Sequence, residues 1–242
     1  MKVEALFISD VHLGSTKSKA EDLLETLNKI EPEVLFIVGD LFHLWQLTSI
    51  RWSQDEKDVI SKIIHMSKNG TKVIYIPGNH DEFLRSTTIK LFTGLLFKNI
   101  EIHNHYVWNE TFITHGDLFS AIKGLGFTNS QTTEAELIFQ AKLHGCKNVI
   151  SGHSHLCGNR IVDGVRVMNT GDWVLNKSYI VYNKGVFNLT KLYIPITYTP
   201  TTYHFPYSYT YVPKYSYLDV PLKENKKSRK KKFKQRKRTK RC

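Results

Sequence analysis

Five short apolar runs in this 242-residue chain are each followed at once by Asp, Asn or His. The runs end in the motifs SDVHLG, VGDLFH, PGNHDEF, THGD and GHSH, which supply Asp10, His12, Asp40, Asn79, His80, His115, His153 and His155. Any one of these residues, taken alone, is most often an ordinary loop residue. Five exits from strand-like runs that all deliver side chains able to bind a metal are hard to attribute to chance.

The donor types of this set indicate the chemistry. Carboxylate, imidazole and amide oxygen together suit Mn²⁺, Fe or Zn²⁺, whereas Ca²⁺ prefers more oxygen donors and structural zinc prefers thiolates. Two such ions about 3.5–4 Å apart can hold a hydroxide between them and bind the oxygens of a phosphoryl group, provided that one carboxylate bridges them. The set therefore predicts a two-metal site for phosphoryl chemistry.

The segments around these residues alternate between strand and helix patterns. Strand-like runs are VEALFIS, VLFIV, KVIYI, TFIT and NVIS, and the helix-like runs are KAEDLLETLNKI and QDEKDVISKIIHMSKNG. The runs RIVDGVRVMN and SYIVYNKGVFNL predict hairpins that turn at Asp163-Gly164 and Asn183-Lys184-Gly185. This pattern predicts an α/β core with a β-rich end. In such folds the carboxyl ends of parallel strands share one edge, so the polar residues can meet there.

The ordered motifs D-x-H, GD, GNHD, HG and GHxH, between residues 10 and 155, resemble those of the calcineurin-like metallophosphoesterase superfamily. The resemblance implies a four-layer α-β-β-α sandwich of two mixed sheets flanked by helices. It also implies two metal ions, most commonly Mn²⁺ with Fe or Zn²⁺ as alternatives. The implied ligands of one ion are Asp10, His12 and His155, those of the other are Asn79, His115 and His153, and Asp40 bridges the two.

The resemblance also assigns catalytic roles next to the metals. His80 matches the family position that contacts the phosphate and assists the leaving group, and Asp81 matches the residue that orients it. His43 lies in GDLFH, a run that also occurs in double-strand-break repair nucleases, where this histidine helps manage the nucleic-acid backbone. A catalytic His43 and a merely structural or solvated one stay equally open.

A narrower likeness suggests a substrate. FHLW with KVIYIPGNHDEFLR, then HGD and MNTGDWV, is similar to the UDP-2,3-diacylglucosamine pyrophosphohydrolase branch, over about residues 3–190. That branch cleaves a nucleotide-linked pyrophosphate, so the expected substrate is a phosphorylated small molecule or a UDP-sugar-type compound. One alternative is a phosphodiesterase or nuclease that acts on nucleic acid. Another is a non-catalytic, metal-bound binding module.

Charge divides the chain into three parts. Residues 223–242 hold thirteen Lys and Arg and one Glu, so they carry the whole net charge of +12, and the remaining residues balance at 21 basic and 21 acidic. Such a block repels itself and is expected to be a disordered tail. Two interpretations stay open: a tail attracted to nucleic acid or an anionic membrane surface, and a solvated or targeting tail with no partner. Residues 193–222 are rich in Tyr, Thr and Pro and predict an extended connector. The phosphoesterase domain is then expected over residues 1–192.

Composition limits the location of the protein. The three cysteines are too few and too irregularly spaced for a disulfide framework, so reduced thiols are expected. No run reaches the eighteen or so apolar residues of a membrane span, and the first residues enter a strand pattern without the features of a signal peptide. We expect a cytoplasmic protein without a transmembrane segment. The sequence leaves the oligomeric state open.

Overall fold

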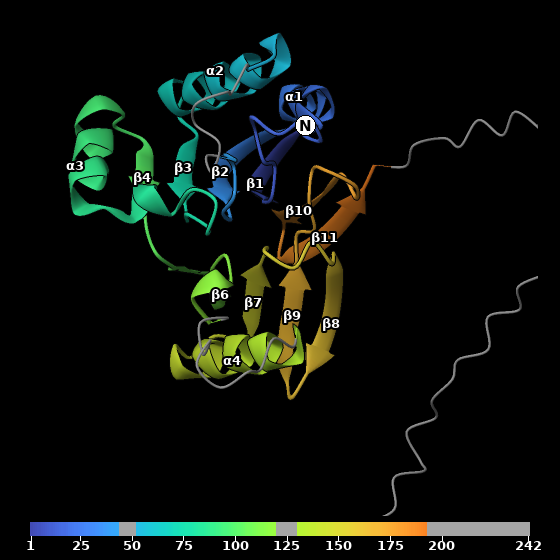
Figure 1. The fold of residues 1–242 in the computed structure, drawn as a ribbon. Coiled ribbons are helices and arrows are strands. Elements are labelled where there is room, and N and C mark those ends of the chain that lie inside the picture. The colour runs from blue at the N-terminus through green and yellow to red at the C-terminus, as the bar shows by residue number, and fades with distance from the viewer. Residues whose placement is uncertain (44–51, 120–129, 193–242) are drawn as a thin grey trace, which may run out of the picture. The chain divides into compact units, whose positions relative to one another are not determined.

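A computed structural model describes residues 1–43, 52–119 and 130–192 (Figure 1). Within these residues, the first sheet has the strand order β11-β10-β1-β2-β3-β4. Strands β1 to β4 run parallel, whereas β10 is antiparallel to β1 and β11 is antiparallel to β10. The bounds are β1 Lys2–Ile8, β2 Glu31–Ile37, β3 Lys72–Tyr75, β4 Ile100–Ile102, β10 Ser178–Asn183 and β11 Val186–Lys191.

The second sheet has the order β5-β6-β7-β9-β8 among the described residues. Its inner strands β6, β7 and β9 run parallel, and the outer strands β5 and β8 are antiparallel to their neighbours. The bounds are β5 Tyr106–Trp108, β6 Thr111–Ile113, β7 Asn148–Ser151, β8 Gly158–Val162 and β9 Val165–Asn169. Both sheets are therefore mixed, with parallel strands at their centres.

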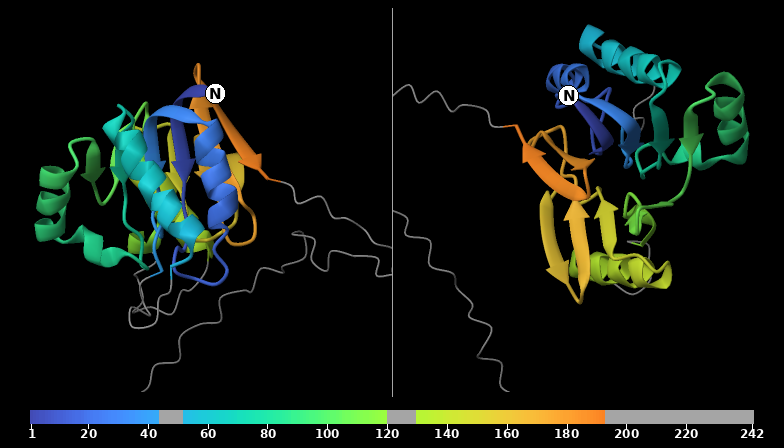
Figure 2. Two further views of the ribbon diagram at one scale, coloured as in Figure 1. Left: turned by 90° about the horizontal axis from the view of Figure 1, so that it is seen from above. Right: turned by 180° about the vertical axis from the view of Figure 1, so that it is seen from behind.

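Helices cover the outer face of each sheet. Helices α1 and α2 lie side by side on the first sheet, and α4 lies on the second (Figures 1 and 2). Helix α2 begins at a capping box, in which the Ser53 side chain and the Glu56 side chain each accept from the other's backbone N–H. The helices are α1 Ala20–Lys29, α2 Gln54–Lys68, α3 Thr87–Leu96 and α4 Ser130–Leu143, with short 3₁₀ turns η2 Glu82–Arg85 and η3 Asp117–Phe119.

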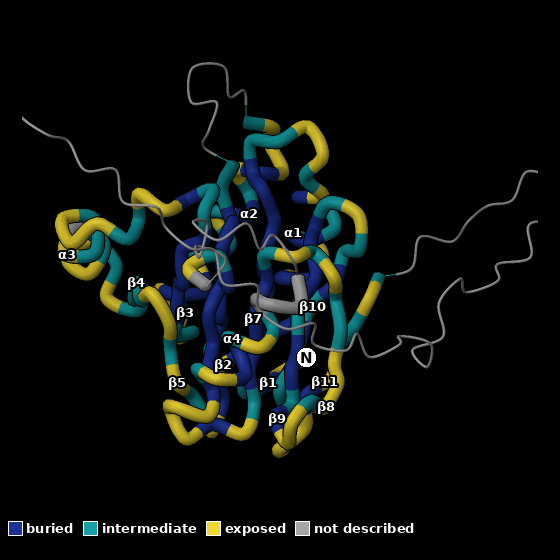
Figure 3. The backbone as a smooth tube through the Cα atoms, turned by 60° about the horizontal axis from the view of Figure 1, so that its bottom comes forward, coloured by how far each residue is buried: buried dark blue, intermediate teal, exposed yellow. Residues whose placement is uncertain are grey.

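Three apolar clusters lie between the four layers. The first joins α1 and α2 to the first sheet and includes Leu23, Leu27 and Val59. The second lies between the two sheets, where Phe7 stacks on Phe36 with ring centroids 4.7 Å apart. The third joins α4 to the second sheet and includes Leu137, Ala141 and Val149. The central strands are accordingly the most deeply buried parts of the described chain (Figure 3), and the expected four-layer α-β-β-α sandwich is confirmed.

The hairpins expected at Asp163-Gly164 and Asn183-Lys184-Gly185 are present, as β8–β9 and β10–β11. No helix within the described ranges is long and apolar enough to cross a membrane. The predicted connector at residues 193–222 and the predicted basic tail at residues 223–242 lie outside the described residues.

Candidate metal centre

The loops that follow β1 and β2 lie against each other at the carboxyl edge of the first sheet. Asp10 N–H donates to the Gly39 carbonyl over 3.0 Å, and His12 N–H donates to the Asp40 carbonyl over 3.0 Å. The parallel pairing of β1 with β2 thus continues into the loops and sets SDVH beside VGD. This pairing brings Asp10, His12 and Asp40 together.

Five of the seven expected ligands have a left-handed backbone, with positive φ. These are Asp10 (52°), His12 (52°), Asp40 (52°), His153 (65°) and His155 (59°). Residues with a Cβ adopt this region rarely because of steric repulsion, and such residues cluster at functional sites. The packing of the surrounding fold holds the backbone in this conformation and thereby directs these side chains.

Three donor atoms converge at the first group. His155 Nε2 lies 3.2 Å from Asp10 Oδ1 and 3.3 Å from His12 Nε2, and His12 Nε2 lies 3.9 Å from Asp10 Oδ1. Asp10 Oδ1 is buried and has no hydrogen-bond partner among the described residues. A buried carboxylate oxygen without a hydrogen bond is costly unless a cation binds it. Two imidazoles and one carboxylate fit a divalent cation of the Mn²⁺, Fe or Zn²⁺ kind.

Asp40 and His115 form the core of the second group. His115 Nε2 lies 3.3 Å from Asp40 Oδ2, while His115 Nδ1 donates to the Val38 carbonyl over 2.8 Å. That second bond fixes the ring with Nε2 toward the carboxylate, as in many metal-binding histidines. Asp10, Asp40 and His115 each offer a donor atom within 4.8 Å of the others. Asp10 is therefore shared by both groups, whereas Asp40 belongs to the second, and its role as the bridge between two ions stays a prediction.

Asn79 and His153 lie beside this second group. The His153 ring is 5.2 Å from the His115 ring, and the His153 N–H donates to Asp10 Oδ2 over 3.0 Å. Gly78, the residue before Asn79, passes so close to Asp40 and His115 that an added Cβ would collide with both side chains. His153 therefore lies next to the second group, and the close packing of Gly78 carries the loop of Asn79 past Asp40 and His115. The roles of Asn79 and His153 as ligands stay predictions.

Burial and mutual charge shift the pKa values of these groups. Burial lowers the pKa of His12 to about 4, so this imidazole is neutral and keeps a lone pair for a metal. Burial opposes the ionised form of Asp40, but the hydrogen bond and charge of His115 outweigh it and hold the Asp40 pKa at about 2. Burial also opposes protonation of His115, yet Asp40 and Asp10 raise its pKa to about 10. In the absence of a metal, His115 therefore carries a proton that faces Asp40, and a metal ion bound between the two side chains would displace this proton.

A third group contains the proposed catalytic histidines. The His80 ring stacks on the His43 ring with centroids 4.7 Å apart and an angle of 27°, and it also lies 4.7 Å from the His12 ring. Burial lowers the pKa of His80. His43 is therefore adjacent to the metal ligands, which favours a role in the site over a purely solvated side chain.

Asp81 braces the loops that carry the ligands. Its carboxylate is fully buried and accepts hydrogen bonds from Gly78 N–H over 2.6 Å, Leu41 N–H over 2.9 Å and the Tyr75 hydroxyl. These bonds connect the loop after β2 with the loop after β3, and so join Asp40 to Asn79. The role of Asp81 in orienting His80 stays a prediction.

An ion pair braces two further loops. The Arg85 guanidinium donates to both oxygens of Asp117 over 2.7 and 2.8 Å and to the Pro77 carbonyl over 2.7 Å. Pro77 precedes the Asn79 loop and Asp117 follows His115, so this half-buried pair holds the two loops in register. Arg85 lies in the run PGNHDEFLR, but its position in the sequence does not predict its pairing with Asp117.

The segment after β9 contains the run MNTGDWV, which the sequence linked only to a substrate class, and it also contacts the site. The Asn169 side-chain amide donates to the Gly152 carbonyl over 2.6 Å, the Ser9 and Thr170 hydroxyls are hydrogen-bonded over 2.5 Å, and Trp173 N–H donates to the Asp10 carbonyl over 3.0 Å. Strand β9 is parallel to β7 and ends at the same edge. The rule that polar residues follow parallel strands could therefore have identified this segment.

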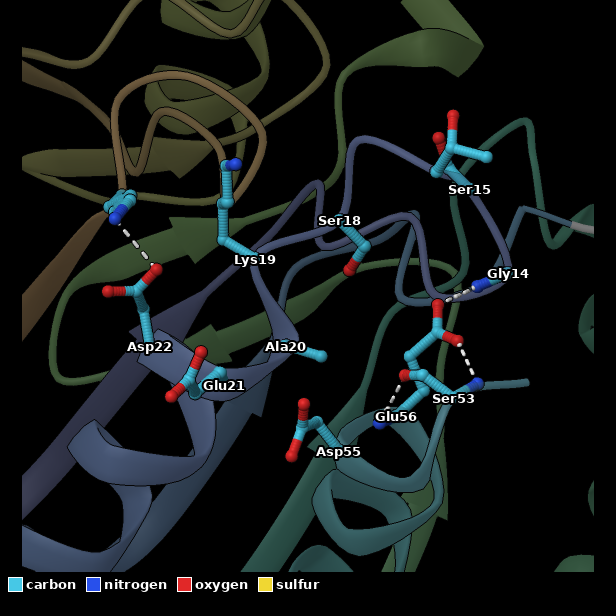
Figure 4. Close-up of a pocket in the computed structure, with 12 residues that line it drawn as sticks. Gly14, Ser15, Ser18, Lys19, Ala20, Glu21, Asp22, Ser53, Asp55 and Glu56 are labelled. Atoms are coloured by element: carbon cyan, nitrogen blue, oxygen red, sulfur yellow. Dashed lines mark hydrogen bonds and ion pairs between the residues drawn. The ribbon is translucent and has the colours of Figure 1, made fainter.

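A separate pocket of about 420 Å³ lies between the start of α1 and the start of α2 (Figure 4). Its buried Glu56 carboxylate accepts from the N–H groups of Gly14 and Ser53, and Lys177 pairs with Asp22 over 2.7 Å. The expected metal ligands are not among its lining residues. The bond from Gly14 anchors the loop that follows His12, so the contribution of Glu56 to the site is indirect.

Comparison with known proteins shows the family of the chain. The family model of the calcineurin-like phosphoesterases matches residues 4–182, and the chain belongs to this family, whose members depend on metal ions. No protein among the curated sequences compared with the chain matches it.

Several solved structures resemble the fold. An archaeal phosphodiesterase is 17% identical with a TM-score of 0.47, covering 78% of this chain and 99% of its own. YfcE, a phosphoesterase from E. coli, is 20% identical with a TM-score of 0.47, covering 76% of this chain and 90% of its own. A Vps29 mutant from Entamoeba histolytica is 13% identical with a TM-score of 0.46, covering 78% and 97%. These likenesses are too distant to indicate a substrate.

Proposed function

We propose that the chain is a dinuclear metal-dependent phosphoesterase that hydrolyses a phosphoester or pyrophosphate bond. The observation that carries the proposal is the position of Asp10, because its carboxylate belongs both to the group with His12 and His155 and to the group with Asp40 and His115. Asp10, His12 and His155 would hold one ion and Asn79, His115 and His153 the other, with Asp40 between them. When bound, two divalent ions supply a hydroxide nucleophile near neutral pH and positive charge for the phosphoryl oxygens.

The side chains around the ions have separate tasks. His80 is held through its N–H, which donates to Asp40 Oδ1 over 2.8 Å, and its ring lies beside the His12 ring. In this position His80 contacts the phosphoryl group and passes a proton to the leaving oxygen. His43, stacked on His80, supports the same proton transfer. Asp81 and Arg85 keep the loops rigid, so that the geometry needs no rearrangement during the reaction.

Mn²⁺ is the proposed metal, with Fe or Zn²⁺ as alternatives. The donor atoms are carboxylate oxygens, an amide oxygen and imidazole nitrogens, and the described cysteines Cys146 and Cys157 are in none of the groups. Mixed oxygen and nitrogen donors favour these metals over the thiolate-rich sites of structural zinc.

The proposed substrate is a UDP-sugar-type pyrophosphate, on the strength of the runs FHLW and MNTGDWV. A phosphodiesterase or nuclease acting on nucleic acid is a second candidate, favoured by the contact of His43 with His80 and by the +12 charge of residues 223–242. We propose a cytoplasmic location, with the basic tail adding salt-sensitive attraction to nucleic acid or an anionic membrane.

A hydrolysis screen tests the activity and separates the substrates. The protein should be stripped of metal, reloaded with Mn²⁺ and assayed on bis-p-nitrophenyl phosphate, UDP-sugars, cyclic nucleotides, and single- and double-stranded DNA. We expect Mn²⁺-dependent hydrolysis of the p-nitrophenyl diester that a chelator removes. Turnover of UDP-sugars supports the first substrate class, and turnover of DNA supports the second. A metal-loaded protein that hydrolyses none of these compounds would favour a binding module.

A further inference from the structure

Among the described residues after β9, none belongs to either metal group, yet Asp172 and Asn176 both contact His155. Asp172 is fully buried, and it is followed by a turn in which Val174 and Asn176 are half-buried and Leu175 is exposed. This segment follows the strand that pairs with β7, and β7 leads into the loop that carries His155. The fold therefore places Asp172 and Asn176 next to His155, on the side of the residue that faces away from Asp10.

The two oxygens of Asp172 have different partners. Oδ1 accepts from the backbone N–H groups of Val174 over 2.7 Å and Asn176 over 3.1 Å, and so closes the turn. Oδ2 accepts from the side-chain amide of Asn176 over 2.5 Å and lies 3.7 Å from His155 Nδ1. One oxygen thus stabilises the turn, and the other faces the histidine.

Asn176 connects Asp172 with the backbone of His155. Its side-chain nitrogen donates both to Asp172 Oδ2 and to the His155 carbonyl, the latter over 2.8 Å. His155 has a φ of 59°, a conformation that needs support from its surroundings. The His155 backbone is therefore held by Asn176, and its ring is faced at Nδ1 by a carboxylate while Nε2 points to Asp10.

We propose that Asp172 and Asn176 are positioning residues for the metal centre: they fix the ring and backbone of His155, so that its Nε2 reaches the ion shared with Asp10 and His12. The negative charge of Asp172, 3.7 Å from Nδ1, favours the tautomer with the proton on that nitrogen, which leaves the Nε2 lone pair for the metal. The inference rests on the proposed function, because it assumes that His155 is a ligand.

Asp172→Asn tests the positioning role selectively. An asparagine keeps one oxygen to accept from the backbone of the turn, but it places an amide N–H where Asn176 and His155 need an acceptor. Mn²⁺ binding to the metal-stripped full-length protein should be measured by isothermal titration calorimetry. We expect one of two sites to weaken by about 10–100-fold, the usual effect of removing such a partner, with the other site unchanged.

A second readout separates positioning from general damage. The Mn²⁺ concentration that gives half-maximal hydrolysis of bis-p-nitrophenyl phosphate should rise by a similar factor, and the rate at saturating Mn²⁺ should recover to within a few fold of wild type. Leu27→Ala is the matched control, because it removes a buried side chain of α1 and touches no metal donor. It should lower the melting temperature and leave both Mn²⁺ titrations unchanged.

The outcomes are distinct. A wild-type protein that binds no Mn²⁺ would overturn the proposed function itself. A wild-type protein that binds two ions, with an Asp172→Asn variant that titrates in the same way, would overturn only the positioning role. If Asp172→Asn does not fold, Asn176→Ala leaves the carboxylate and the turn in place and should weaken the same site by about tenfold. Unchanged affinity in that variant would equally refute the inference.

Discussion

Residues with a left-handed backbone, with positive φ, occur at both ends of the parallel strands, but their surroundings differ between the two ends. At the amino end, the hairpin turns contain residues with positive φ, among them Asp163 and Lys184. Each is followed by a glycine at which an added Cβ would meet nothing within 4 Å. At the carboxyl end, positive φ occurs at Asp10, His12 and Asp40, which are buried. The hairpins follow ordinary turn geometry. At the candidate metal centre the same backbone directs polar side chains inward, at a cost that the surrounding fold must offset.

The two ends also differ in the space around their glycines, as Gly39 and Gly185 show. Gly39 and Gly185 have nearly equal φ values, 87° and 81°. A Cβ added at Gly39 would collide with the His115 ring, whereas a Cβ added at Gly185 would meet nothing within 4 Å. Both positions therefore need a residue that tolerates positive φ, but only Gly39 also lacks space for a side chain.

The largest expected effect comes from this glycine pair. Gly185→Ala should cost about 1–2 kcal/mol, because the conformational penalty acts alone. Gly39→Ala carries the same penalty, adds about 1–3 kcal/mol of overpacking and displaces the His115 ring, so Mn²⁺-dependent hydrolysis should disappear. Urea unfolding and hydrolysis assays of both variants measure these effects. Equal losses of stability, with activity retained in Gly39→Ala, would contradict the close packing inferred at this end.

A second effect separates catalysis from metal binding within the carboxyl end. Because His80 is proposed to act on the phosphoryl group, His80→Ala should leave the metal content unchanged and lower turnover by about 10²–10⁴-fold. The loss should be smaller for p-nitrophenyl esters than for alkyl esters, since a good leaving group needs less help from an acid. An equal loss for both kinds of ester would argue against the acid role.

The smallest effect is a pH dependence confined to the metal centre. In the metal-free protein the pKa of His115 is about 10, above the ordinary value of 6.5, so its stabilising effect is complete below pH 6.5 and is lost as the pH rises toward 10. The melting temperature of chelator-treated protein should therefore exceed that of His115→Asn by a margin that shrinks between pH 6.5 and 9. A constant margin across this range would show that the proton is not held by the folded state.

Much of the fold follows from local patterns. Strands β1, β2, β3, β6 and β7 match short apolar runs that end at polar or turn residues, and helices α1 and α2 match runs with a helical apolar period. Helix α4 was not predicted, since Leu137, Ile138 and Ala141 are buried while Phe139 and Leu143 are exposed, which blurs its amphipathic pattern. Strands β4 and β5 have three residues each, too few to show a period, and they exist through pairing with β3 and β6.

In the site, too, some residues could be predicted from the sequence and others could not. Asp10, His12, Asp40, His115 and His155 could be predicted to meet, because they directly follow strands and their types suit a metal. The supporting residues could not be assigned from the sequence: Asp172 reaches His155 and Arg85 reaches Asp117 only through tertiary contacts. Sequence patterns reveal donors at strand ends, whereas the residues that hold those donors depend on how the loops pack.

The central claim is that Asp40 joins two metal ions, and Asp40→Asn tests it most directly. An asparagine retains the size of the side chain and an oxygen for the His80 N–H, but it removes the charge that two cations require. After loading with Mn²⁺ and removal of unbound metal, elemental analysis should give about two ions per wild-type chain and one or none per variant chain. The variant should have a native circular dichroism spectrum and no hydrolysis of bis-p-nitrophenyl phosphate. A folded Asp40→Asn protein that retains two ions per chain would contradict the account.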